Sequence, residues 1–294
     1  MRIETLGDGL RVAVADNAGA LTLDGSRTYL VGNDPAVLID PGPPGSGQLD
    51  LLGRLVEGRT VGLVCLTHAH ADHSGAAQDM ATRLGCDVAA SADTLARLGL
   101  TGRVLTDQEE IAIDVDAGNE DTGSGGSRLR VLATPGHTGD HLCYLWLPGR
   151  QLFTGDLVLG SGTSVILHPD GDVGAYLASL ERVTGEEPAL ILPGHGEPVT
   201  DPAELLREYV EHRLEREAQI EAALAALEEG ERSVDAIRNR VYGALPPGVD
   251  RAADASIRAH LRHIEMRAGL PPVEGYSSTL GDSGALDEGG ELEA

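Results

Sequence analysis

The sequence predicts a layered α/β fold. Its first two hundred residues contain short runs rich in Val, Ile and Leu, and several are apolar at nearly every position, as expected of strands buried on both faces. Segments of helical pattern lie between these runs, and interleaved strands and helices are typical of layered α/β domains. The 39 glycines and 15 prolines recur between the runs as turn signals. With 294 residues the chain can form one large domain and a small appendage.

The apolar runs give the expected strands in order. Eight segments are predicted as strands, namely 10–15, 28–32, 36–40, 61–66, 129–133, 142–147, 151–155 and 189–193. Trp146 and Phe153 fall within these segments and are predicted to be core residues. Helical patterns over 74–84 and 173–183 separate some of the strands.

The pattern changes at Asp201. Asp201 as N-cap and Pro202 at the first helical position predict a long amphipathic helix that ends at Gly230. Two shorter helical patterns follow, over 233–242 and 250–268. The C-terminal part is therefore predicted to be helical.

Composition divides the chain into four parts. We expect an α/β domain over 1–200, a connecting helix over 201–230, a compact helical module over 231–275 and an acidic tail over 276–294. The tail is nearly devoid of apolar residues and is predicted to be disordered. An acidic Gly/Ser-rich insert over 114–127 receives the same prediction.

Charge and cysteine content restrict the environment of the protein. The formal net charge of −25, with arginine as the only basic residue besides histidine, opposes general binding to nucleic acid or anionic membranes. Three well-separated cysteines are predicted to be buried thiols in a reducing compartment. The chain shows neither a signal-peptide pattern nor an apolar run of membrane-spanning length. We therefore expect a cytoplasmic protein that makes no membrane contact.

Side chains that commonly bind metals follow several of the predicted strands directly. They are His68, His70, Asp72 and His73 within HAHADH, together with His137, Asp156 and His195. Functional groups of layered α/β folds collect at strand ends. Seven ligands are too many for one tetrahedral zinc ion and sufficient for two metal ions. Imidazole and carboxylate without thiolate favour Zn²⁺, with Mn²⁺ or iron as alternatives, and two such ions would share a bridging hydroxide.

Four motifs resemble the metallo-β-lactamase superfamily. They are HAHADH, TPGHTGDH, FTGD and LPGHG, and the resemblance covers about residues 20–200. It implies an αββα sandwich with the metal site at one edge. Carried over residue by residue, it implies one metal at His68, His70 and His137, a second at Asp72, His73 and His195, and Asp156 as the bridging ligand.

Two longer segments narrow the resemblance. TLDGSRTYLVG and GSGTSVILHPDGDVGAYLASLERV are similar to the branch that contains lactamase-β-like protein 2, whose members add a small winged-helix-like module after the catalytic domain. This implies a winged-helix-like fold for 231–275. Arg27 departs from the pattern, because the branch commonly has asparagine at this position. If that asparagine contacts substrate, the resemblance does not imply the same substrate for this chain.

Other polar residues receive secondary roles. Asp40 ends a predicted strand and matches an acidic position that in the family supports the metal loop, the alternative being an ordinary turn residue. His141 is predicted either to bond substrate or a product oxyanion, or to have a structural role beside the next strand. The remaining histidines are predicted to be packing or surface residues and not ligands: His168, His212, His260 and His263.

The first functional hypothesis is a dinuclear zinc-dependent hydrolase of a small-molecule ester or thioester, because the motifs resemble those of glyoxalase II. The bridging hydroxide would attack the carbonyl, and Asp72 would orient it or accept a proton. Asp72 and Asp156 are thus the catalytic candidates. True β-lactamase action is disfavoured, because the common branch of those enzymes has a cysteine ligand where this chain has Asp156.

Three alternatives remain open. One is an endoribonuclease acting on single-stranded RNA, as in the lactamase-β-like protein 2 branch. Residues 231–268 include seven arginines and five acidic residues, which gives this segment a net charge of +2. Arg251, Arg258 and Arg262 share one helical face that could hold a phosphate backbone. Another is an iron-dependent persulfide dioxygenase. The last is a nucleic-acid-binding regulator, which a complete set of metal ligands disfavours.

Overall fold

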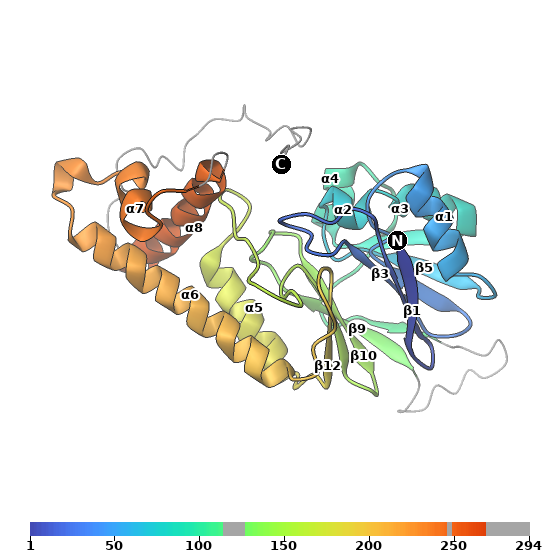
Figure 1. The fold of residues 1–294 in the computed structure, drawn as a ribbon. Coiled ribbons are helices and arrows are strands. Elements are labelled where there is room, and N and C mark those ends of the chain that lie inside the picture. Colours follow the sequence, from blue (N-terminus) through green and yellow to red (C-terminus); the bar gives the residue numbers. More distant parts are fainter. Residues whose placement is uncertain (114–126, 246–248, 269–294) are drawn as a thin grey trace.

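The computed structural model describes residues 1–113, 127–245 and 249–268. Two β-sheets pack face to face, and helices cover their outer faces (Figure 1). The inner faces share one apolar cluster that includes Tyr29, Val131 and Phe153. Strand side chains alternate between faces, so Tyr29 and Val31 of one strand enter this inner cluster while Leu30 joins an outer one. This is the αββα sandwich that the sequence predicts.

The first sheet has seven strands in sequence order. Its members are β1 (Arg2–Gly7), β2 (Leu10–Val14), β3 (Arg27–Val31), β4 (Ala36–Ile39), β5 (Val61–Cys65), β6 (Asp87–Ala90) and β7 (Arg103–Val104). Strands β1 to β4 pair antiparallel and β4 to β7 pair parallel. The outer face is covered by α1 (Ser46–Leu55), α3 (Ala77–Leu84) and α4 (Ala92–Leu98), and the single turn α2 (Ala71–Ser74) follows β5.

The second sheet has five strands in the order β12-β11-β10-β9-β8. They are β8 (Glu110–Ala112), β9 (Arg128–Ala133), β10 (Leu142–Leu147), β11 (Gln151–Gly155) and β12 (Leu190–Pro193). Only β11 and β12 pair parallel. Helices α5 (Val173–Gly185) and α6 (Pro202–Ala225) pack on the outer face, in a cluster that includes Leu180, Leu206 and Tyr209.

All eight predicted strands are present, and the helix predicted over 173–183 is α5. Two expectations are wrong in detail. The helix expected over 74–84 begins only at Ala77, as α3, because the amide of Ala76 donates to the carbonyl of Gly42 instead of continuing from α2. Helix α6 ends at Ala225, before Gly230. The following Leu227 packs within a separate apolar cluster.

The C-terminal part packs as a small helical unit. Helices α7 (Val234–Val241) and α8 (Asp250–Ala268) form that cluster together with Leu227 and the end of α6, and an exposed 3₁₀ turn (Glu229–Glu231) precedes α7. Figure 1 shows α7 and α8 beside the end of α6. The described residues after 200 contain helices and no strand, so the winged-helix-like fold and the four domain boundaries stay predictions. The predicted insert over 114–127, except Ser127, and the predicted tail over 276–294 lie outside the described residues. Within the described ranges, every helix is too short or too polar to span a bilayer.

Candidate metal centre

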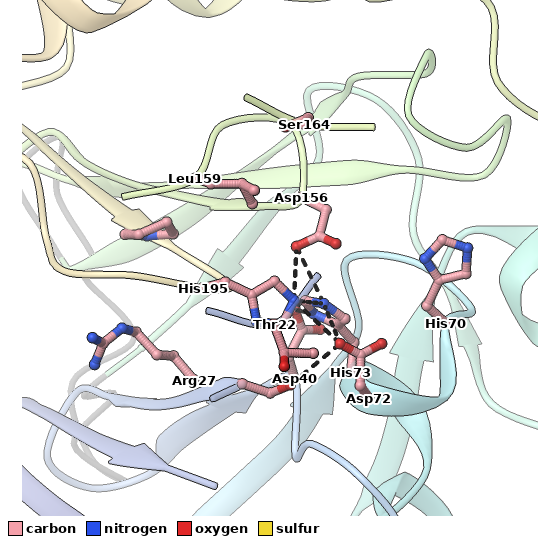
Figure 2. Close-up of polar contacts among 12 residues, drawn as sticks. Thr22, Arg27, Asp40, His70, Asp72, His73, Asp156, Leu159, Ser164 and His195 are labelled. Carbon is pink, nitrogen blue, oxygen red and sulfur yellow. Dashed lines mark hydrogen bonds and ion pairs between the residues drawn. The ribbon is translucent and has the colours of Figure 1, made fainter. Parts of the chain in front are cut away.

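The seven predicted ligands meet at one edge of the sandwich, and Figure 2 shows five of them, His70, Asp72, His73, Asp156 and His195. The segment after β5 carries four of them, and each of the others lies in a loop that follows β9, β11 or β12. Their potential ligand atoms form two groups. The first ligand group is His68, His70, His137 and Asp156, and the second ligand group is Asp72, His73 and His195. Within each group these atoms lie within 4.8 Å of one another.

The spacing in the first ligand group suits one metal ion. His70 Nδ1 lies 2.9 Å from His68 Nε2 and 3.2 Å from His137 Nε2. Asp156 Oδ2 lies 3.7 Å from His137 Nε2. Ligand atoms around tetrahedral zinc, with bonds of about 2.0–2.1 Å, are separated by about 3.3–3.4 Å. The three nitrogens and the oxygen are therefore close to the positions that zinc requires.

The second ligand group has the same spacing. His195 Nε2 lies 3.2 Å from His73 Nε2 and 3.1 Å from Asp72 Oδ2. Asp156 Oδ1 lies 3.3 Å from each of these two histidine nitrogens. Asp156 thus presents one carboxylate oxygen to each group, which is the position of a bridging ligand (Figure 2). Gly194 is required beside it, because a Cβ there would lie 2.5 Å from His73 Cε1.

Burial and charge set opposite protonation states within this cluster. Burial lowers the pKa of His68 well below its usual range, and the neighbouring His73 adds to this effect, so the ring is neutral and can bind metal. Burial would also lower the pKa of His195, but the charge of Asp156 together with the hydrogen bonds of Asp156 and Asp72 outweighs it and raises the pKa to about 9. The carboxylates of Asp156 and Asp72 likewise raise the pKa of His73.

The two central carboxylates are ionised. Burial would raise the pKa of Asp156, yet the charges of His73 and His195 hold it well below its usual range. For Asp72 the same opposition leaves a pKa of about 2. Without metal, two imidazolium ions therefore balance two carboxylates, and bound zinc ions would take the place of the protons.

Asp40 supports one histidine from each group. Its Oδ2 accepts hydrogen bonds from His73 Nδ1 at 2.9 Å and from Thr67 Oγ1 at 2.7 Å. Thr67 Oγ1 in turn lies 3.0 Å from His68 Nδ1 and can accept its proton. These contacts fix the tautomers that turn both Nε2 atoms toward the centre, the supporting role predicted for Asp40. Thr67 was missed, although it directly precedes the histidine motif.

His141 lies behind Asp156 and does not face the open side of the site. Its Nδ1 is 2.9 Å from Thr134 Oγ1, and its Nε2 accepts a hydrogen bond from the backbone amide of Asp156 at 3.2 Å. Only 1% of the residue is exposed. Of the two roles predicted for His141, the contacts match the structural one.

Arg27 points away from the metal centre (Figure 2). It is buried, and its guanidinium forms ion pairs of 2.8 Å with Asp24 and Glu197. It therefore braces the loop that carries His195 and does not line the substrate side. Its neighbour Ser26, which sequence reasoning missed, donates to Asp72 Oδ2 at 3.2 Å.

The other histidines lie outside both ligand groups, as predicted. His263 Nδ1 lies 2.5 Å from Glu217 Oε2, so it links α8 to α6. The backbone amide of His168 donates to the carbonyl of Ala255 in α8 at 3.2 Å. Burial lowers the pKa of the His168 ring, and the charges of Arg262 and Arg258 lower it further. Two residues of the predicted arginine face of α8, Arg258 and Arg262, therefore lie near His168 in the loop that follows Asp156.

Proteins of known sequence or structure are similar to this chain over most of its length. The family model described as the metallo-β-lactamase superfamily matches residues 21–195. A β-lactamase-like protein 2 homolog from Caenorhabditis elegans is 31% identical over 89% of this chain and 86% of its own length. An atrochrysone carboxyl ACP thioesterase from Aspergillus chevalieri is 30% identical over 82% of this chain and 75% of its own length. The crystal structure of a metallo-β-lactamase family protein from Thermus thermophilus superposes with a TM-score of 0.71 at 20% identity, covering 91% of this chain and 98% of that one.

Proposed function

The chain belongs to the metallo-β-lactamase superfamily and is a metal-dependent hydrolase; from this premise we propose that it holds two zinc ions and cleaves a small-molecule thioester or ester. The observation that carries the proposal is the placement of Asp156, with one oxygen toward each of two ligand groups of suitable spacing. We assign one metal to each group, with Asp156 as the bridging ligand. Mn²⁺ and iron are the alternative metals.

Two zinc ions in these groups would lower the pKa of a shared water and polarise the substrate carbonyl. Residues around the metal ligands hold the ligand side chains in position. Asp40 and Thr67 hold His68 and His73, so the imidazoles need no rearrangement when substrate arrives. The side chain of Asp72 is 30% exposed and ionised, and Ser26 and His195 engage its Oδ2. Asp72 is thus placed to orient the attacking water from the open side.

The thioester class is favoured by the relatives. A protein named as an acyl-carrier-protein thioesterase aligns with most of this chain, including the metal centre. Thioesters and oxygen esters both react through a tetrahedral intermediate at the carbonyl, so the same stabilisation of the oxyanion would act on either class. A small-molecule substrate also agrees with a net charge of −25, which repels extended polyanions.

A parallel activity panel tests the proposal. Zinc-loaded protein is assayed with an acyl thioester, S-lactoylglutathione and single-stranded RNA, with Asp156→Ala as the blank. We expect turnover of thioesters that disappears in the blank. Cleavage of RNA alone would replace the proposal with the nuclease function. One iron ion per purified chain, together with oxygen consumption on a persulfide, would replace it with the dioxygenase function.

Cleavage of single-stranded RNA is the second candidate function. It is supported by Arg258 and Arg262, one turn apart on α8 and close to His168 in the loop that follows Asp156. Guanidinium groups there would contact phosphates beside the metal centre. Replacing both arginines with alanine should lower RNA cleavage and its salt dependence while thioester turnover stays constant. RNA cleavage and salt dependence that are unchanged in the double variant would show that these arginines do not hold the RNA, and a protein that cleaves no single-stranded RNA removes this candidate.

We also propose that the protein works in the cytoplasm and that residues 231–275 form a winged-helix-like module. Three free cysteines, with Cys65 and Cys143 fully buried, agree with a reducing compartment. Cell fractionation tests the first point, and an experimental structure of the full chain tests the second.

A further inference from the structure

Arg213 of α6 is a buried cation. It is 4% exposed, and its guanidinium carbon lies 5.3 Å from the centre of the Tyr176 ring. Across the described residues no carboxylate forms an ion pair with it, and burial lowers the pKa of its guanidinium. Burying an unpaired charge is unfavourable, so the contacts that it does make must offset the cost.

The main polar contact of Arg213 is the backbone of the loop beside the metal centre. Its Nη2 donates a hydrogen bond to the carbonyl of Ser164. The next carbonyl along the chain, that of Val165, lies 2.7 Å from His137 Nδ1 and accepts its proton. Arg213 therefore holds the peptide unit directly before the Val165 carbonyl. That carbonyl orients His137, a ligand of the first group. This contact fixes the tautomer in which His137 Nε2 is free for a metal.

Other contacts from the C-terminal helices hold the same loop. The hydroxyl of Tyr209, one turn before Arg213 on α6, accepts from the amide of Leu159 at 2.9 Å. Helix α8 binds the amide of His168 through the carbonyl of Ala255 at 3.2 Å. Figure 2 shows Leu159 and Ser164 beyond Asp156, on the side opposite Asp72. The loop is thus attached to α6 and α8 at three points.

We propose that Arg213 is a positioning residue of the metal centre, which acts through Ser164 and Val165 on His137. The inference rests on the proposed dinuclear site. It adds that α6, which carries none of the predicted ligands, controls one metal position. Loss of the Arg213 hydrogen bond should therefore weaken binding at the first ligand group and spare the second.

Arg213→Met is the sharpest test. Methionine keeps much of the apolar stem but removes both the buried charge and the hydrogen bond; because the gain from the first offsets the cost of the second, the melting temperature should stay close to that of the wild type. We expect the zinc affinity of one of the two sites to fall by about 10–100-fold, the usual effect of losing a partner outside the ligand set. The kcat should fall while KM stays constant. Arg213→Lys, which restores a donor, should recover part of both losses.

Two further variants make the result decisive. His137→Ala identifies the zinc site of the first ligand group in a chelator titration. Ile220→Ala removes a buried side chain from α6 inside the C-terminal cluster, so it should lower the melting temperature without changing zinc affinity. Arg213→Met with two sites of wild-type affinity, or with both sites weakened equally, overturns the inference. A wild-type chain that binds fewer than two zinc ions overturns the proposed function itself, before any variant is compared.

Discussion

At the scale of single residues, the centre depends most on Asp156, whose two oxygens lie between the ligand groups. Asp156→Ala removes the shared ligand and the main negative charge opposite His73 and His195. We expect turnover to fall by more than the roughly 10–100-fold that follows loss of a supporting partner. Initial rates and metal content measure the effect. Asp170→Asn is the matched control, because this carboxylate pairs with Arg97 outside both groups. Full turnover in Asp156→Ala would remove the bridging assignment.

The protonation states of the centre predict a pH dependence of zinc binding. In the metal-free protein the pKa of His195 is about 9 and that of His73 is also raised, so both are protonated at pH 7. Zinc binds only the neutral rings and must displace these protons, so its affinity should rise with pH up to about 9 and each uptake should release protons.

Zinc titration in weakly buffered solution measures the protons directly. Asp156→Asn should release fewer protons, because it removes the charge that raises the histidine pKa values. Zinc uptake without proton release between pH 7 and 9 would contradict the predicted protonation states.

Several site residues could be predicted from sequence because each ligand stands in a short motif directly after an apolar strand. Asp40 is found in the same way, at the end of β4. Thr67, the carbonyl of Val165 and Arg213 could not be predicted, because their roles depend on contacts with residues 27 to 49 positions away in the chain. A backbone carbonyl has no sequence signal of its own.

At the scale of elements, a close approach between the β9–β10 loop and α5 determines where His137 lies. Gly136 has φ of 140°, and a Cβ there would lie 2.3 Å from the Cα of Tyr176. Gly136→Ala should destabilise the fold by about 1–3 kcal/mol and displace His137, with loss of bound zinc. Urea unfolding and metal analysis measure both effects. Gly185→Ala, in open space at the end of α5, is the control. Equal stability of the two variants would show that the loop can relax.

Four of the described strands were not predicted from the sequence, and each lacks a long run of Val, Ile and Leu; β6, for example, is the four-residue segment DVAA. Strand β1 is largely exposed at a sheet edge and has no apolar run, while β7 and β8 contain only two and three residues. The eight strands predicted correctly are those in which burial on one or both faces imposes an apolar pattern. Helix α6 was found from its N-cap, but its end depends on the packing of Leu227 in the C-terminal cluster.

At the scale of the whole molecule, the C-terminal helices complete the outer face of the second sheet. Leu206 and Tyr209 of α6, together with Ala259 of α8, belong to the apolar cluster that α5 and the sheet also form. Burying side chains the size of leucine and tyrosine contributes about 1.5–3 kcal/mol each, a large share of the roughly 5–15 kcal/mol that stabilises a typical domain. All ligand motifs lie before α6 in the sequence, but the apolar cluster that stabilises the fold around them includes residues of α6 and α8.

A fragment ending at residue 200 should therefore be poorly folded, although it contains all seven ligands. We expect it to melt at a lower temperature than the full chain, to bind a hydrophobic dye and to hold less zinc, because the cluster is opened and the contacts of Tyr209 and Arg213 with the metal loop are lost. Leu214→Ala in the full chain is the control, since this α6 residue is 48% exposed and its loss should change stability by less than about 0.5 kcal/mol. A fragment with wild-type melting and two bound zinc ions would show that the α/β domain is independent of α6.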